Sequence, residues 1–219
     1  HNSLANINLT NLNNLIDLNC DTNYNLNITD FSPLIKLVNL NCNNTNLRSL
    51  DLSNNGLLET LKIDFLSGFD VDLSNNTALT SLSAQSSDLT SLNVKNGNNI
   101  NITFFDARYN QFSCIQVDDP TASYLSSWRK DNTTSFELDC GETSISDSDF
   151  EYYLENHDKD GNIVSVGSQN SLGNGKIDDG KVLTSRIKVV TSLDVSDLSI
   201  GELIGINDFE SLEVLNCSK

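Results

Sequence analysis

The sequence predicts a β-rich solenoid in which short parallel strands stack coil upon coil. The main observation is an apolar pattern, L-x-x-L-x-[C/I/A], that restarts every 21 to 23 residues. Its rungs are Leu15-Leu18-Cys20, Leu37-Leu40-Cys42, Leu58-Leu61-Ile63, Leu79-Leu82-Ala84 and Ile102-Phe105-Ala107. A fixed period of this length is typical of stacked units, because one unit has too little apolar surface to close a core alone.

A second apolar strand follows most of these rungs. Its members are Leu47-Leu50-Leu52, Val71-Leu73, Leu89-Leu92-Val94 and Phe112-Ile115-Val117. Side chains alternate across a strand, so each coil should carry two short strands with their apolar residues inward. Asn-rich turns such as residues 53–55 separate the strands, and asparagine suits the left-handed backbone of such turns.

Residues 73–82 read LSNNTALTSL, which closely resembles the leucine-rich repeat proteins of bacterial cell surfaces, especially the Bacteroidota type LTSLDLSNNTxLTxLxCxxN. The rungs at Leu15 and Val190 keep a 22-residue form similar to internalin repeats, and the resemblance covers nearly the whole chain. It implies leucine-rich repeats of 21–23 residues, export, and an extracellular or outer cell-surface location.

Four segments are expected along the chain. Residues 1–117 form a repeat block whose N-terminal part is missing, and residues 118–140 form its C-terminal cap, where Trp128 covers the exposed end of the stack. Residues 141–189 form an α/loop cap and junction, because residues 145–155 resemble the family's opening segment, and residues 190–219 begin a second block. The rung at Leu15 recurs at Leu212, so we expect a longer tandem-repeat protein.

The cysteines suggest two roles. Cys114 and Cys140 flank the cap and are expected to form a disulfide, which suits an oxidising extracellular setting; two free thiols are the alternative. Cys20, Cys42 and Cys217 occupy inward positions of their rungs and are expected to be buried thiols rather than metal ligands.

A candidate calcium loop follows the helix-like residues 151–155. Asn156, Asp158, Asp160 and Asn162 belong to an N-x-D-x-D-G-x-I sequence, the first two-thirds of an EF-hand-like loop. Its twelfth position is Gly167 instead of glutamate, so a second turn would have to supply the missing carboxylate. That turn adds two further candidate ligands, Asp178 and Asp179. The alternative is an ordinary polar loop; bound calcium would stiffen the junction.

Charge and residue content exclude several function classes. The 30 acidic and 13 basic residues give a net charge of -17, which would repel nucleic acids and anionic membranes. No apolar run predicts membrane insertion, and no nucleophile lies in a catalytic motif. The only histidines are His1 and His157. We therefore expect a protein that is not an enzyme.

Binding is the predicted function, on the outward positions of the first strand ladder. Early rungs display mainly Asn and Asp, whereas later rungs are chemically varied. The candidate ligand-binding residues are Lys62, Asp64, Phe65, Phe104, Asp106, Arg108 and Tyr109. Such a face suits a protein or a glycan ligand. Two alternatives are that Phe65 and Phe104 tuck under turns, and that the chain is a structural spacer of an adhesin stalk, with self-association in a repeat array.

Overall fold

The computed structural model describes residues 3–28 and 30–219. By its internal contacts the chain divides into two compact units, His1–Asn132 and Thr133–Lys219. The first unit carries the repeated rungs of the sequence, and the second carries the helices α1 and α2.

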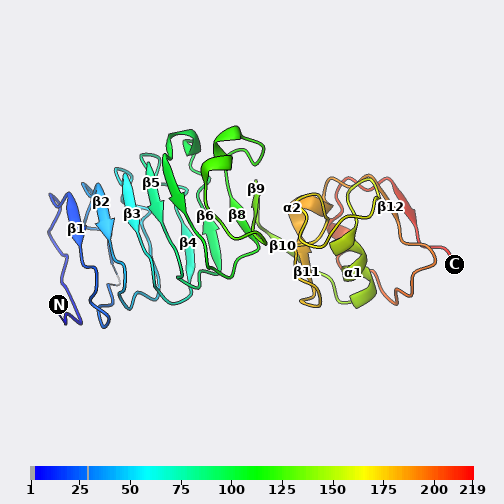
Figure 1. Ribbon diagram of the computed structural model, residues 1–219, viewed down its shortest axis with the longest axis horizontal. Coiled ribbons are helices and arrows are strands. Elements are labelled where there is room, and N and C mark those ends of the chain that lie inside the picture. Colours follow the sequence, from blue (N-terminus) through cyan, green and yellow to red (C-terminus); the bar gives the residue numbers. More distant parts are fainter. Residues whose placement is uncertain (1–2, 29) are drawn as a thin grey trace. The chain divides into compact units, whose positions relative to one another are not determined.

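One sheet of the first unit is built from the predicted rungs. Its strands, in spatial order, are β1 (Asp17–Asn19), β2 (Asn39–Asn41), β3 (Thr60–Lys62), β5 (Ser81–Ser83) and β7 (Phe104–Asp106). All neighbours pair in parallel with offsets of 21 to 23 residues, which aligns Leu40, Leu61 and Leu82 across the sheet. The predicted parallel strands are thus confirmed, and successive coils lie side by side (Figure 1).

A second set of parallel strands comes from the other side of each coil. It contains β4 (Asp70–Asp72), β6 (Ser91–Asn93) and β8 (Cys114–Gln116), with Val71, Leu92 and Ile115 at their centres. These three side chains are at most 1% exposed. Burying each such side chain contributes about 1.5–3 kcal/mol, so the inward residues of both sheets supply the main stabilisation. Two 3-10 helices, η1 (Asn99–Asn101) and η2 (Ser123–Ser127), complete the unit.

Buried polar side chains connect one coil to the next. Asn76 is fully buried, and its Nδ2 donates to the carbonyl oxygens of Leu52 (3.1 Å) and Asn55 (3.0 Å) in the preceding coil. Ser87 also connects two coils, because its Oγ donates to the carbonyl of Ile63 in the preceding coil at 2.6 Å. Buried carbonyl groups must be hydrogen-bonded, so these side chains keep successive turns in register.

The second unit combines short strands with helices. Its elements are β9 (Ser135–Glu137), β10 (Glu142–Ser144), α1 (Ser148–Asn156), β11 (Lys181–Leu183), α2 (Thr184–Ile187), β12 (Ser192–Asp194), η3 (Ile206–Asp208) and β13 (Val214–Asn216). Strands β10 and β11 pair antiparallel, and β12 and β13 pair in parallel. Helix α1 includes the predicted helical residues and starts earlier, because Asp147 caps it by accepting from the amides of Asp149 and Phe150.

Helix α1 anchors the core of this unit. Phe150 and Leu154 are fully buried, and the ring of Phe150 lies 6.2 Å from that of Phe209, centroid to centroid. Glu155, also fully buried, accepts hydrogen bonds from the backbone of the loop that passes beside the helix. Gly173 is required in that loop, since a Cβ there would lie 2.0 Å from Glu155 Oε1.

The free cysteines are Cys20, Cys42 and Cys217, whereas Cys114 and Cys140 are disulfide-bonded. Cys20 and Cys42 occupy neighbouring coils with their sulfurs 3.7 Å apart, and both are buried, which confirms the predicted core thiols. The same prediction is wrong for Cys217, which is exposed because no later coil of the described chain covers it.

Candidate functional site

The first sheet of the first unit shows its outward residues in columns, because its strands are in register. One column contains Asp17, Asn39, Thr60, Ser81 and Phe104, and the next contains Asn19, Asn41, Lys62, Ser83 and Asp106. Early coils are polar and uniform in both columns. Chemical variety is therefore confined to the coils of β3, β5 and β7.

Beyond the strands, every coil of this sheet turns at a residue with left-handed backbone. These corner residues are Thr22, Asn44, Phe65, Ser86 and Tyr109, with φ between 51° and 63°. Left-handed backbone suits glycine or asparagine and is unfavourable for a bulky side chain. Two corners nevertheless carry aromatic rings, which are 58% exposed in Phe65 and 62% exposed in Tyr109. Their rings are held in solvent at a conformational cost.

Phe104 adds a third ring to this surface, from the first position of β7. It is 45% exposed, so neither Phe65 nor Phe104 tucks under a turn. Neighbouring strands lie about 4.8 Å apart, which places the corners of Phe65 and Tyr109 roughly 10 Å from each other, two coils apart. We use the name rung-face patch for Lys62, Asp64, Phe65, Phe104, Asp106, Arg108 and Tyr109, the candidate binding residues of the sequence.

Asp64 supports the patch from below rather than projecting from it. It is only 7% exposed. Its carboxylate accepts hydrogen bonds from Ser83 Oγ (2.8 Å), the amide of Gln85 (2.7 Å) and Asn43 Nδ2 (3.0 Å). These bonds satisfy both oxygens and tie three neighbouring coils together, so Asp64 positions the surface that a ligand would meet.

Asp106, the last residue of β7, is likewise buried, at 1% exposed. Arg108 binds it through two hydrogen bonds, from Nε at 3.0 Å and from a terminal guanidinium nitrogen at 2.8 Å. These bonds raise the pKa of Arg108 above its usual value. The Arg108 guanidinium also lies 5.6 Å from the centre of the Tyr109 ring, within the range of a cation–π contact. Asp106 thus fixes Arg108 against Tyr109.

The sequence did not identify two residues that complete this surface. Arg129 forms a parallel bridge with Asp106, and its guanidinium lies 3.7 Å from the Asp106 carboxylate. Asp131 accepts the amides of Tyr109 (2.9 Å) and Asn110 (3.0 Å), which holds the left-handed corner in place. Both residues follow the last repeat, in a segment without a period, so no sequence pattern could align them with β7.

The candidate calcium loop forms a polar turn. Asp158 Oδ1 accepts the amides of Asp160 (3.0 Å) and Asn162 (2.8 Å), the pattern of an Asx turn. The Asp160 carboxylate is paired with Lys159 at 2.8 Å. The Asn156 amide, in the orientation that satisfies its neighbours, donates to the Tyr153 carbonyl at 3.0 Å.

The second part of the predicted calcium site lies on the turn at Asp178 and Asp179. Asp178 has left-handed backbone (φ 63°), and Asp179 accepts Asn174 Nδ2 at 3.0 Å. Within residues 3–28 and 30–219, no three His, Cys, Asp or Glu side chains converge in a group that could hold a metal ion. Calcium binding by this loop stays a prediction from the sequence, which a calorimetric titration with calcium would test.

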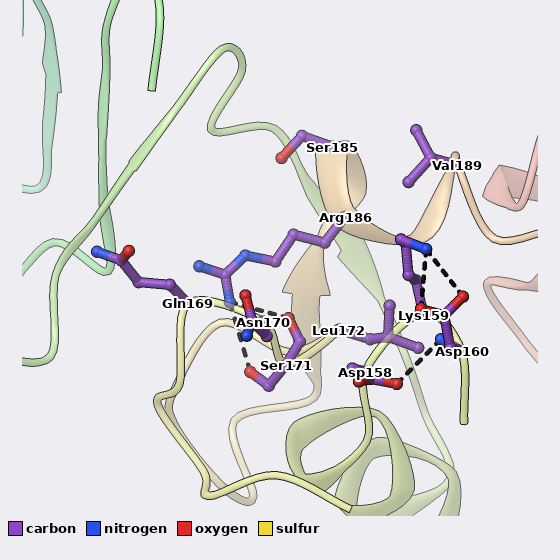
Figure 2. A pocket seen from close by; sticks show the side chains of 10 residues that line it. All are labelled: Asp158, Lys159, Asp160, Gln169, Asn170, Ser171, Leu172, Ser185, Arg186 and Val189. Atoms are coloured by element: carbon purple, nitrogen blue, oxygen red, sulfur yellow. Dashed lines mark hydrogen bonds and ion pairs between the residues drawn. The ribbon is translucent and has the colours of Figure 1, made fainter. Parts of the chain in front are cut away.

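A pocket of about 430 Å³ lies in the second unit and is shown in Figure 2. Arg186 enters it, but this guanidinium is paired with Glu137 at 2.6 Å and donates to the carbonyls of Ser171 (3.0 Å) and Gly173 (2.9 Å). Lys159, on the other side of the view, points at Asp160. The charged groups of the pocket therefore stabilise its walls, and the rung-face patch remains the better candidate for binding.

The described helices are short. Helix α1 has 9 residues and α2 has 4. No helix in the described part of the chain has both the length and the apolar content needed to span a membrane.

Comparisons with known proteins give one distant likeness. No protein-family model matches the chain, and no curated protein matches it. Among solved structures, the chain is similar to the functional domain of InlJ from Listeria monocytogenes, described as including a cysteine ladder, with 25% sequence identity and a TM-score of 0.48. The match covers 97% of this chain and 41% of that one. The chain therefore spans less than half the length of that structure.

Proposed function

We propose that this chain is a non-catalytic, extracellular interaction module that binds a protein partner on the rung-face patch. The observation that carries the proposal is the placement of Phe65 and Tyr109, two exposed rings on left-handed corners. Backbone strain and solvent-exposed rings both oppose stability, so a binding role accounts for them better than a folding role. The proposal includes the finer fold assignment, a leucine-rich repeat solenoid of a bacterial surface protein.

A protein suits the chemistry of the patch better than a glycan does. Phe65 and Phe104 have no polar group, so their rings gain most by burial against apolar side chains. Tyr and Arg are the residue types that most often dominate the binding energy of protein interfaces, and Tyr109 and Arg108 lie in contact here. Asp64 and Asp106 keep the surrounding surface rigid, which lowers the entropy lost on binding.

A spacer within a longer adhesin is the second candidate function. It is favoured by the first two coils, whose outward positions on β1 and β2 carry only small polar groups, Asp17, Asn19, Asn39 and Asn41. A spacer needs no chemically varied surface. The same chain could combine a polar spacer surface with one binding patch, so the test must address the patch itself.

The test is a selection from a phage-displayed library of random peptides, panned on the full chain. The selected peptides are then titrated against the triple variant Phe65→Ser, Phe104→Ser and Tyr109→Ser. A matched control replaces three exposed apolar residues outside the strand ladder, Ile35→Ser, Leu57→Ser and Ile100→Ser, which are 53%, 54% and 73% exposed.

We expect peptides that bind the wild type and the control equally. The triple variant should bind them about a hundredfold more weakly, since three aromatic contacts are lost. Melting temperatures of the variants at or above that of the wild type would show that the fold is intact. Failure to select any peptide, or equal binding by the triple variant, would overturn the proposal in favour of the spacer.

A further inference from the structure

We propose that the partner presents an acidic, extended peptide segment to the rung-face patch. This inference rests on the proposed function and specifies the chemistry of its ligand. The chain as a whole has a net charge of -17, so a surface on which exposed cations outnumber exposed acids is unusual for it. The patch is such a surface.

The acids of the patch are hidden and the cations are not. Asp64 and Asp106 are 7% and 1% exposed, and their oxygens are occupied by neighbouring donors. Next to the patch, the Arg129 side chain is 62% exposed. Lys62 is exposed and takes part in none of the ion pairs of residues 3–28 and 30–219. Asp131, which also borders the patch, is half-buried, and its two oxygens accept the amides of Tyr109 and Asn110. An approaching ligand therefore meets mainly positive charge beside the three aromatic rings.

Arg129 keeps donors free for a ligand. Its closest approach to Asp106 is 3.7 Å, beyond the length of a hydrogen bond, whereas Arg108 holds Asp106 at 2.8 Å. The buried carboxylate is thus satisfied mainly by Arg108, and Arg129 can turn its planar guanidinium toward a carboxylate of the partner. Arginine and carboxylate form paired, charge-assisted hydrogen bonds, which are stronger than neutral ones.

The register of the sheet sets the spacing between the two free cations. Lys62 pairs with Ser83, Ser83 with Asp106, and Asp106 with Arg129, so three strand steps separate Lys62 from Arg129. At about 4.8 Å per step, the two backbones lie roughly 14 Å apart. An extended peptide rises about 3.4 Å per residue, and residues four apart point to the same side. Acidic residues at positions i and i+4 would therefore reach both cations, with apolar residues between them facing the rings.

The far end of the same sheet carries exposed negative charge instead. Asp17 and Asp21 are exposed on the first coil, whereas the exposed cations are Lys62 on β3 and Arg129 beside β7. An acidic segment is attracted to the later coils and repelled by the first. Such complementarity raises the association rate and selects against wrong partners.

The test uses the panned peptides and one synthetic pair. A peptide of leucine and serine with Glu at positions i and i+4 is compared with its Gln counterpart by fluorescence anisotropy. Both are titrated against the wild type and the variant Lys62→Gln/Arg129→Gln. The control Lys36→Gln/Arg48→Gln removes the same two residue types from exposed positions outside the strands of the sheet.

We expect acidic residues to be enriched among the selected peptides. The Glu peptide should bind about tenfold more tightly than the Gln peptide, and the Lys62→Gln/Arg129→Gln variant should remove that difference while the control keeps it. Equal binding of the two synthetic peptides, or enrichment of neutral or basic sequences, would overturn the inference.

The outcomes separate this inference from the proposed function. Neutral peptides that still need Phe65, Phe104 and Tyr109 would leave the protein-binding function standing and refute the acidic partner. Binding of heparin at the patch without binding of any peptide would identify an anionic polysaccharide instead and refute both.

Discussion

Two buried carboxylates determine how helix α1 holds the loop beside it. Glu155 accepts the amides of Asn174 (2.6 Å) and Gly175 (2.9 Å), and Glu151 accepts the amide of Asp179 at 3.0 Å. Burial raises the pKa of both glutamates, and these amide hydrogen bonds offset only part of that rise. The charged form is therefore costlier in the folded than in the unfolded chain.

The raised pKa of Glu155 predicts a specific pH dependence. The folded state binds this proton more tightly than the unfolded chain does. The contribution of Glu155 to stability is therefore fully present below the ordinary glutamate pKa of 4.5 and is lost as pH rises through the folded pKa. Glu155→Gln should remove part of that fall, as measured by denaturant unfolding across a pH series. Asp147, whose pKa is lowered, contributes stability that is lost as pH falls, and it does so in the wild type and in Glu155→Gln alike.

The control for this prediction is Glu210→Gln, at an exposed position of the same unit. It should leave the pH profile as it is in the wild type. A profile of Glu155→Gln that coincides with the wild-type profile would contradict the assignment of the fall to Glu155.

At the scale of elements, the corner residues of the first sheet differ in how well they suit their backbone conformation. Asn44 and Ser86 place small, unbranched polar side chains on left-handed backbone, whereas Phe65 and Tyr109 place large rings there. Stabilising substitutions are easiest to find where function has kept a residue that the backbone disfavours.

Phe65→Asn should therefore raise the free energy of unfolding by about 0.5–1 kcal/mol, because asparagine tolerates this corner better than phenylalanine. The same variant should weaken binding of the selected peptides. Phe104→Asn is the comparison: Phe104 lies in β7 instead of a left-handed corner, so its replacement should weaken binding without the gain in stability. A destabilised Phe65→Asn would show that the ring packs more than its 58% exposure suggests.

The buried asparagines that join successive coils lead to a prediction of the opposite sign. Asn76→Ala would leave the carbonyls of Leu52 and Asn55 without their donor, which should lower the free energy of unfolding by about 2–3 kcal/mol. The neighbouring exposed variant, Asn75→Ala, should change it little. Thermal unfolding of the two variants compares them directly, and similar losses in both would contradict a structural role for the buried amide.

At the scale of the whole molecule, the excess of acidic residues acts on stability and on binding in opposite ways. With 30 acidic and 13 basic residues, the excess negative charge repels itself, which destabilises the folded chain at low ionic strength. The same salt that screens this repulsion also screens the attraction between the patch cations and an acidic peptide.

Added sodium chloride should therefore raise the melting temperature while weakening the binding of the Glu peptide. Thermal unfolding and anisotropy, measured over one salt series, test both effects. The Gln peptide serves as the control and should show little salt dependence. A Glu peptide that binds equally well at low and high salt would contradict an electrostatic contribution to binding.

The leucine period was enough to predict the parallel sheet, because register and burial depend on the same residues. Leu40, Leu61 and Leu82 align as the repeat implies. The spacing also placed the aromatic residues on the outward face, although it did not reveal the left-handed backbone of Phe65. Phenylalanine is rare in that conformation, so a phenylalanine at this position would predict extended backbone instead.

Contacts between segments that differ in pattern could not be predicted. Arg129 reaches Asp106 from a segment without repeats, and Arg186 pairs with Glu137 across 49 residues. Charged side chains occur throughout this sequence, so residue type alone does not select a partner. The interpretation of Asp64 and Asp106 as outward ligand groups omitted the hydroxyl, amide and guanidinium donors that cover them.

The hydrogen-bonded asparagines also bear on the chemical lifetime of the chain. Deamidation is fastest at Asn-Gly, where the glycine nitrogen attacks the side-chain carbonyl, and the sequence has three such pairs, at Asn55, Asn96 and Asn174. All three side chains are buried, and each Nδ2 is held by an acceptor. An amide fixed in this way cannot swing into the cyclic intermediate, so ageing should begin at exposed asparagines, and the sites most vulnerable by sequence are protected by the fold.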